Sequence, residues 1–238
     1  MDKIDQIYTD KPFYGRIKVT QELNRVGIKV NHKRVYRLMK LMGIKALVPR
    51  KNWNLSKANP NHQIYPYLLK NLVIKKPNQV WGVDITYVKL NRGWLYLTAI
   101  MDWYSRYVLS WQLADSLATD FCAETLQMAL AINQPKIHNS DQGSQFTSQA
   151  YINILKQYPN IQISMDGRGR AFDNIFTERL WRTIKYEEIY LKDYQSPKEA
   201  RLSVQKYIKF YNQERLHQSL NYQTPAEVYF GKVKLQNH

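Results

Sequence analysis

The spacing of apolar residues changes near position 77 and divides the chain into parts. Within residues 4–42 the apolar positions recur at helical spacing, interrupted by "KPFYG" and "RVGIKVN". Further along, short apolar runs alternate with turn residues, which is typical of strands. We therefore predict a helical domain over 1–50, a basic linker over 51–76, an α/β core over 77–190 and a C-terminal helical extension over 191–238.

The spacing of residues in the first helical region is typical of a helix-turn-helix. Gly27 is placed to end one helix and Asn31 to cap the next. In that next helix an apolar stripe consists of Val35, Leu38, Met39 and Met42, and the residues off the stripe include Lys33, Arg34, Arg37 and Lys40. The pattern predicts a basic helix that enters a major groove. A small helical bundle with a solvated basic face would give the same pattern and is the alternative.

The pattern after Gln79 predicts a meander followed by alternating helices and strands, which indicates a mixed sheet. Strands are expected at 80–90, 94–101, 107–113, 136–139 and 161–164. Helices are expected at 118–132, 148–158 and 173–186, and in "PKEARLSVQKYIKFYNQER". Within the linker, "YLLKNLVI" is interpreted as a short helix.

The charge of the chain is strongly positive and uneven. The 238 residues carry a formal charge of +16, and residues 1–76 hold 17 Lys and Arg against four Asp and Glu. Such a block attracts a polyanion by releasing its counterions. An acidic membrane surface is the rival partner, but no apolar run approaches the roughly 18 residues of a spanning helix, and no signal-peptide pattern opens the sequence. Nucleic acid is therefore the expected partner.

The single cysteine, Cys122, excludes an internal disulfide and a cysteine-based zinc site. It lies in the amphipathic segment "TDFCAETLQMALAI", so we interpret it as a small buried residue and not as a nucleophile. A reducing, cytoplasmic location fits this cysteine content.

Three carboxylates stand out against this basic background: Asp84 in "VWGVDITYV", Asp141 in "NSDQGSQF" and Glu178 in "FDNIFTERLWRTIK". Strand alternation places Asp84 opposite Val83, and an acid in a β-rich run is costly to bury without a cation or donors. Each acid alone has an ordinary explanation. Asp84 could bond a neighbouring loop, "SDQG" is a common turn, and Glu178 with Arg182 could form a surface pair.

Together the three acids predict a site for two Mg²⁺ or Mn²⁺ ions, because hard cations select oxygen ligands and such pairs act on phosphodiesters. The helical face of Glu178 also carries Arg182 and Lys185. Two other acids compete for a ligand role. We interpret Asp102 as a turn or hydrogen-bonding residue near Ser105 and Arg106, and Asp173 as a helix cap.

Five segments in order resemble one family, the integrase-like DDE transposases of bacterial insertion sequences, specifically their second-frame product in the retroviral integrase superfamily. The segments are "YGRIKVTQELNRVGIKVNHKRVYRLMKLMGI", "PNQVWGVDITYV", "NSDQGSQFTS", "SMDGRGRAFDNIFTERLWRTIKYE" and "FYNQERLHQSLNYQTPAEV". The resemblance implies a ribonuclease-H-like integrase catalytic core, a mixed five-stranded sheet with helices, preceded by a small helix-turn-helix domain.

The resemblance also implies an activity: metal-dependent nicking at the 3′ ends of an insertion element, followed by strand transfer. Asp84, Asp141 and Glu178 would carry the two metal ions, and Lys185 would contact DNA phosphate near the cut. Further DNA contacts are expected from Arg182, Arg168, Arg170, Lys33, Arg34 and Arg37. Two alternatives remain open: a catalytically silent remnant that occupies element ends and regulates transposition, and a nuclease that acts on RNA in hybrids.

The resemblance implies partners as well. Double-stranded DNA of the element ends and of the target is expected, with the protein as a homo-oligomer on that DNA in the nucleoid of a bacterial cytoplasm. The sequence starts a few residues before the helix-turn-helix. Because the family's complete transposase gains an upstream DNA-binding and dimerising segment by frameshift fusion, an upstream-frame partner is a further expectation.

Overall fold

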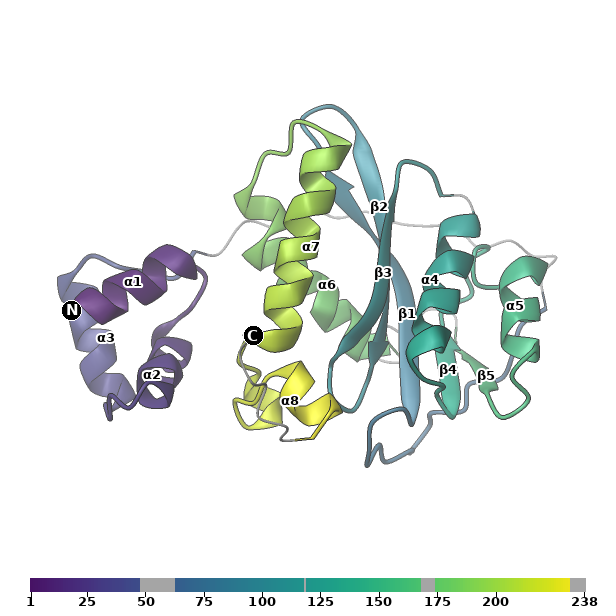
Figure 1. Cartoon of the computed structure of the whole chain (residues 1–238), viewed down its shortest axis with the longest axis horizontal. Helices are drawn as coiled ribbons and strands as arrows, with labels where there is room; N and C mark the ends of the chain where they lie inside the picture. The colour runs from purple at the N-terminus through teal and green to yellow at the C-terminus, as the bar shows by residue number, and fades with distance from the viewer. Residues whose placement is uncertain (48–62, 118, 168–173, 232–238) are drawn as a thin grey trace. The chain divides into compact units, whose positions relative to one another are not determined.

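The computed structural model describes residues 1–47, 63–117, 119–167 and 174–231. The chain divides into two compact units, Met1–Trp53 and Asn54–His238, and each is described by itself below (Figure 1). Within the described ranges, no helix has both the length and the apolar character needed to cross a membrane.

The first unit consists of three short helices, α1 (Asp2–Asp10), α2 (Arg16–Arg25) and α3 (His32–Leu41), and α2 packs against both of the others. Gly27, with φ of 85°, follows the end of α2 in the left-handed region that glycine adopts without strain. The side chain of Asn31 caps α3 by accepting from the Lys33 amide. Both positions were predicted from the sequence.

The apolar stripe of α3 faces the interior of this unit as expected. Val35 and Met39 are buried there, whereas Lys33, Arg34 and Arg37 are exposed. The basic side chains therefore form a solvent-facing surface on α3, which a polyanion can reach.

The second unit is built on a mixed five-stranded sheet with the strand order β3-β2-β1-β4-β5. The pairs β1–β2 and β2–β3 are antiparallel, while β1–β4 and β4–β5 are parallel. The sheet therefore combines a meander with two parallel additions, as the sequence pattern predicted. Its strands are β1 (Val80–Lys89), β2 (Trp94–Asp102), β3 (Val108–Ala114), β4 (Ile137–Ser140) and β5 (Gln162–Met165).

Helices cover the two faces of this sheet separately, with α4 and α5 on one side and α6 and α7 on the other (Figure 1). The helices are α4 (Asp120–Ile132), α5 (Gln149–Lys156), α6 (Ile175–Glu187), α7 (Pro197–Gln213) and α8 (Pro225–Tyr229). Two 3₁₀ turns join them, η2 (Ile189–Leu191) after α6 and η3 (Gln218–Leu220) after α7.

Side chains alternate between the two faces along β1, so this strand contributes residues to both hydrophobic cores. Trp81 and Val83 pack on the α4 side together with Cys122, which is fully buried as predicted. Val80 and Val88 pack on the α6 and α7 side. Asp84 has the same parity as Val80 and Val88, so its side chain belongs to the face that α6 covers.

The predicted short helix in "YLLKNLVI" is wrong. Residues 67–74 are extended around a turn, where Asn71 has φ of 61°. The Leu68 amide donates to the Ser164 hydroxyl at 3.1 Å, and Leu69 is buried. Since an isolated eight-residue helix is marginal, contacts with the end of β5 outweigh the helical pattern.

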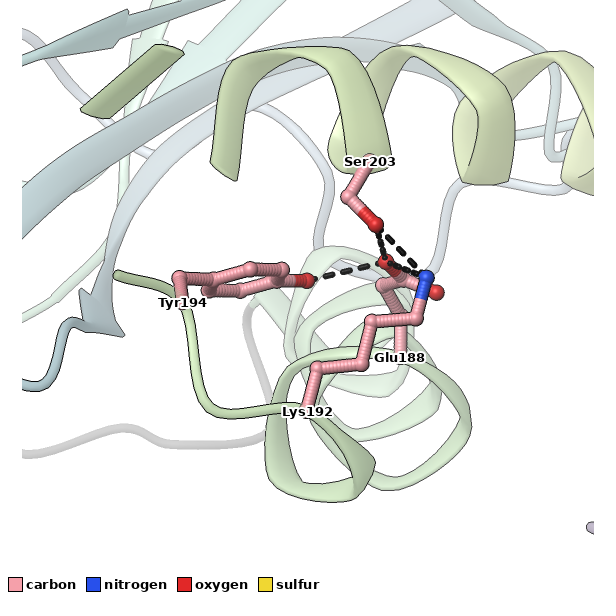
Figure 2. Close-up of polar contacts among 4 residues, drawn as sticks. All are labelled: Glu188, Lys192, Tyr194 and Ser203. Carbon is pink, nitrogen blue, oxygen red and sulfur yellow. Dashed lines mark hydrogen bonds and ion pairs between the residues drawn. The ribbon is translucent and has the colours of Figure 1, made fainter. Parts of the chain in front are cut away.

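A buried carboxylate joins the end of α6 to α7 (Figure 2). Glu188 Oε1 accepts hydrogen bonds from Tyr194 Oη at 2.9 Å and from Ser203 Oγ at 2.5 Å. Lys192 Nζ lies 2.9 Å from the same oxygen. With these donors the buried charge is compensated, and the segment between the two helices is fixed.

The segment "FYNQERLHQSLNYQTPAEV" also ties distant elements together. Asn212, on α7, makes two hydrogen bonds with the backbone of Val108, accepting from its N–H and donating to its carbonyl. Arg215 forms a buried two-bond ion pair with Glu187 at the end of α6, with both bonds at 2.6 Å. This part of the chain therefore fixes α6 and α7 against the sheet.

Candidate catalytic site

Asp84 lies in the middle of β1 and is held by two donors. Its Oδ1 accepts from the Ile85 amide at 2.8 Å, and its Oδ2 accepts from Trp181 Nε1 of α6 at 2.9 Å. Trp181 is buried between α6 and the sheet. The indole therefore fixes the orientation of the Asp84 carboxylate and the position of α6 over it.

Asp141 follows directly after β4. Its Oδ1 accepts from the Gly143 amide at 2.8 Å, which closes a tight turn. A Cβ at Gly143 would lie 2.8 Å from that oxygen, so any other residue there would displace the Asp141 carboxylate. In the parallel register Gly82 lies opposite Asn139. Asp84 and Asp141 each follow this pair by two residues, and the charge of Asp141 acts on the Asp84 carboxylate, so the two acids lie near each other.

The electrostatics agree with this placement. Burial, and secondly the charge of Asp141, raise the pKa of Asp84 to about 7. Burial also raises the pKa of Asp141. Two carboxylates that repel each other in a partly buried site favour either a shared proton or a bound cation.

A further acid, Asp166, lies after the end of β5 and adds to the rise in the pKa of Asp84. Its Oδ1 accepts from Asn139 Nδ2 at 2.8 Å. The sequence analysis missed this residue. The available signal was its place just beyond a strand, the same place that Asp141 occupies.

Glu178 lies in the first turn of α6 and is exposed. Within the described residues, no group of three Asp, Glu, His or Cys side chains converges closely enough to hold a metal ion. Besides burial, Asp141 and Asp166 contribute to the raised pKa of Asp84, whereas burial raises the pKa of Glu178. Trp181, one turn after Glu178 on α6, is buried and packs on the sheet.

Lys185, on α6, is half-buried. Burial lowers the pKa of its ammonium group, and the charge of Asp84 acts in the opposite direction. A lysine within electrostatic range of Asp84 supplies positive charge beside the two acids. Arg182 is exposed on the same helix, with its guanidinium 5.7 Å from the centre of the Tyr186 ring.

Some of the other residues considered in the sequence lie within the described ranges, and others lie outside them. Asp102 is the last residue of β2 and is a buried hydrogen-bonding residue, as interpreted, since its carboxylate accepts from Ser105 and from the Asn78 amide. His138 lies on β4 and is buried, and its ring bonds Tyr151 Oη at 2.9 Å. Arg168, Arg170 and Asp173 lie outside the described residues.

The sequence matches known families along most of its length. Residues 74–171 and 159–225 match two families that are each described as Integrase core domain, and residues 1–52 match the HTH-like domain. Among solved structures, the HTLV-2 integrase catalytic core domain in complex with magnesium is similar, with a TM-score of 0.52 and 21% identity. The match covers 65% of this chain and 97% of that one. The predicted fold, an integrase core preceded by a helix-turn-helix domain, is confirmed.

Two curated relatives match nearly the whole chain. The transposase for insertion sequence element IS904 of Lactococcus lactis is 32% identical over 239 residues, which cover 95% of this chain and 91% of that protein. The transposase for IS629 of Shigella sonnei is 30% identical over 229 residues, which cover 95% and 77% respectively. With its integrase core and helix-turn-helix domain, the chain belongs to the integrase-like transposases of bacterial insertion sequences.

Proposed function

We propose that this protein is a DNA transposase that nicks the ends of an insertion element and joins the freed 3′-hydroxyl to target DNA. The observation that supports this best is the proximity of Asp84 and Asp141 at adjacent parallel strands, with Lys185 in electrostatic range. Both reaction steps are phosphodiester substitutions, so one site can serve both.

The residues fit divalent metal ions. Two neighbouring carboxylates, with the pKa of Asp84 raised by burial and by Asp141, offer hard oxygen ligands whose mutual repulsion a cation would relieve. We propose Asp84, Asp141 and Glu178 as the ligands of two Mg²⁺ or Mn²⁺ ions. When bound, the ions supply activation of the attacking hydroxyl and stabilisation of the leaving oxygen.

The chain's own residues have distinct roles in this proposal. Trp181 keeps one oxygen of Asp84 in place through its indole N–H. Lys185 binds a phosphate oxygen of the strand at the site, because its ammonium group is held near the acids by α6. Glu178, one turn before Trp181 on the same helix, completes the ligand set from the exposed side.

DNA is held by both units. On α3 the exposed Lys33, Arg34 and Arg37 lie along one basic surface that suits the phosphates and base edges of a major groove. On the core we propose contacts from Arg182, Arg168 and Arg170 to DNA phosphates. Joining two element ends to one target requires several binding sites, so we further propose that the protein acts as a homo-oligomer on DNA.

The test is strand transfer by the full chain with oligonucleotides that carry the element ends, in Mg²⁺ or Mn²⁺. Asp84→Asn, Asp141→Asn and Glu178→Gln should each lower the rate at least about 100-fold, as the loss of transition-state charge stabilisation does elsewhere. The exposed Asp115 provides the matched control, and Asp115→Asn should transfer strands at the wild-type rate.

Gel-shift binding of the same oligonucleotides separates chemistry from folding, since all variants should bind the ends as the wild type does. Unchanged transfer in Asp84→Asn would refute the ligand assignment. Tight binding with no cleavage in either metal would show instead a silent regulator of the element. Preferred cleavage of an RNA–DNA hybrid over duplex DNA would identify a different nuclease.

A further inference from the structure

A cavity of about 440 Å³ opens on the core near the start of α6. Trp103, Tyr104 and Arg106 from the β2–β3 turn form one wall, Phe176 of α6 forms another, and the turn after η3 contributes Asn221 and Gln223. Arg106 is the only charged residue among the described residues that line it, and no acid is among them. The function proposed above uses none of these residues.

Arg106 is held in an unusual way. Its φ of 65° lies in the left-handed region, where a non-glycine residue is uncommon and strained. Its guanidinium carbon lies 3.6 Å from the centre of the Phe176 ring, a cation–π contact. Its Nη1 is buried, and within the described part of the chain it has no hydrogen-bond partner. A buried N–H on a charged group is costly unless an acceptor meets it.

Asp102, the acid nearest to Arg106 in the sequence, accepts its hydrogen bonds from other donors. The carboxylate of Asp102 is engaged on both oxygens, by the Asn78 amide and by Ser105. Burial lowers the pKa of the Arg106 guanidinium, the interactions with Tyr211 and Asp102 oppose this decrease, and the positive charge of Arg179 adds to it. An arginine nevertheless stays charged at neutral pH. The cavity is thus lined by one arginine whose charge interacts with Asp102 but whose Nη1 lacks a hydrogen-bond acceptor among the described residues.

Two residues that line the cavity connect it with elements of the candidate catalytic site. Phe176 precedes Glu178 by two residues on α6. On the other side, a Cβ at Gly82 would lie 2.2 Å from Trp103 Nε1, so the Trp103 ring lies against β1 two residues before Asp84. The cavity is therefore lined by a residue of α6 and by a residue that packs on β1, the two elements that carry Glu178 and Asp84.

We propose that this cavity binds a phosphate group of a DNA strand, with Arg106 as its anchor and the amides of Asn221 and Gln223 as further donors. The planar guanidinium matches the geometry of a phosphate through two N–H groups. The choice of DNA as the source of the phosphate rests on the function proposed above. Binding of the phosphate itself does not depend on that function.

Three positions with positive φ allow glycine substitutions that do not strain the backbone. Arg106, Asn221 and Asn71 all have positive φ, at 65°, 52° and 61°, so glycine fits each backbone without strain. Arg106→Gly and Asn221→Gly remove side chains from the cavity. Asn71→Gly is the matched control, because Asn71 is exposed and does not line it. Lys206→Gln, at an exposed position on α7, controls for loss of surface charge.

The experiment titrates the full chain with inorganic phosphate, with single-stranded hexathymidylate and with thymidine, which has no phosphate. Calorimetry should show that Arg106→Gly loses phosphate binding and binds the oligonucleotide at least 10-fold more weakly, with a smaller loss in Asn221→Gly. Both controls should stay within about 2-fold, and thymidine should not bind. All four variants should melt within about 4 °C of the wild type, roughly the shift that 1 kcal/mol produces in a chain of this size.

Several outcomes would overturn the proposal. Equal losses in Arg106→Gly and Lys206→Gln would mean non-specific attraction. If only phosphate binding were lost, the source would be free phosphate and not DNA. If Arg106→Gly failed to fold, unchanged binding in Asn221→Gly would still refute the pocket. Asp84→Asn should keep the phosphate site, so a failure of strand transfer and a failure of the pocket can be told apart.

Discussion

Replacing Asp84 by Asn should stabilise the metal-free protein more strongly as the pH rises. The ordinary pKa of 3.8 is raised to about 7 in the folded protein by burial and by Asp141. The folded protein therefore holds this proton more tightly than the unfolded chain. The contribution of Asp84 to stability is fully present below pH 4, and it is lost as the pH rises through about 7.

The magnitude follows from the two pKa values. A tenfold change in proton affinity is worth about 1.4 kcal/mol, so at pH 8 the charged carboxylate costs the folded state about 4 kcal/mol, against about 2 kcal/mol at pH 5. In the Asp84→Asn variant the new amide would leave one of the donors from Ile85 and Trp181 badly paired. That cost does not depend on pH, so it cancels when the two pH values are compared.

Thermal unfolding of the full chain in a chelator, at pH 5 and pH 8, measures this difference. The advantage of Asp84→Asn over the wild type should grow by about 2 to 3 kcal/mol between the two conditions, or by about 5 to 10 °C in Tm. Asp115→Asn, at an exposed position, should show no such growth. A constant difference at both pH values would refute the electrostatic account, and so would a larger Mg²⁺-induced gain in Asp84→Asn than in the wild type.

Three further predictions concern packing and charge. Gly82→Ala should lower the free energy of unfolding by about 1 to 3 kcal/mol in thermal unfolding, because the new Cβ would lie 2.2 Å from Trp103 Nε1 and displace the ring. Gly15→Ala should lower it much less, because a Cβ there meets open space. Equal losses in the two variants would contradict this. Arg215→Ala should lower the free energy of unfolding by about 3 to 5 kcal/mol in denaturant unfolding, because it leaves the buried Glu187 carboxylate without its ion-pair partner Arg215. A loss below about 1 kcal/mol would show that the ion pair is dispensable. Arg37→Gln should weaken DNA binding and reduce its salt dependence by about one counterion, and an unchanged salt slope would place α3 away from the phosphates.

Much of the core could be predicted because apolar and polar side chains alternate regularly along its strands. The parity of Asp84 against Val83 was enough to place the acid on the opposite face, and the structure confirms it. The proximity of Asp84 and Asp141 depends on which strands are neighbours. Single-sequence patterns do not encode that order, although the resemblance to a known family implied it.

Other features depend on partners far along the chain. A helical wheel describes the α6 residues relative to one another, so it did not show that the indole of Trp181 would bond a carboxylate on the sheet. Asp166 was missed because its significance comes from β5 lying beside β4. The extended path of residues 67–74 depends on Ser164, which lies almost a hundred positions later. Local propensity carries none of this information.

The contacts made by α7 and α8 have a consequence for synthesis of the protein. Asn212 bonds both backbone groups of Val108, and Tyr229 donates to Asn78, which lies 151 positions earlier. The ribosome makes Asp84, Asp141 and Glu178 before it makes Asn212 and Tyr229. An interrupted chain that ends before α7 would therefore contain all three acids without the hydrogen bonds that tie α7 and α8 to Val108 and Asn78.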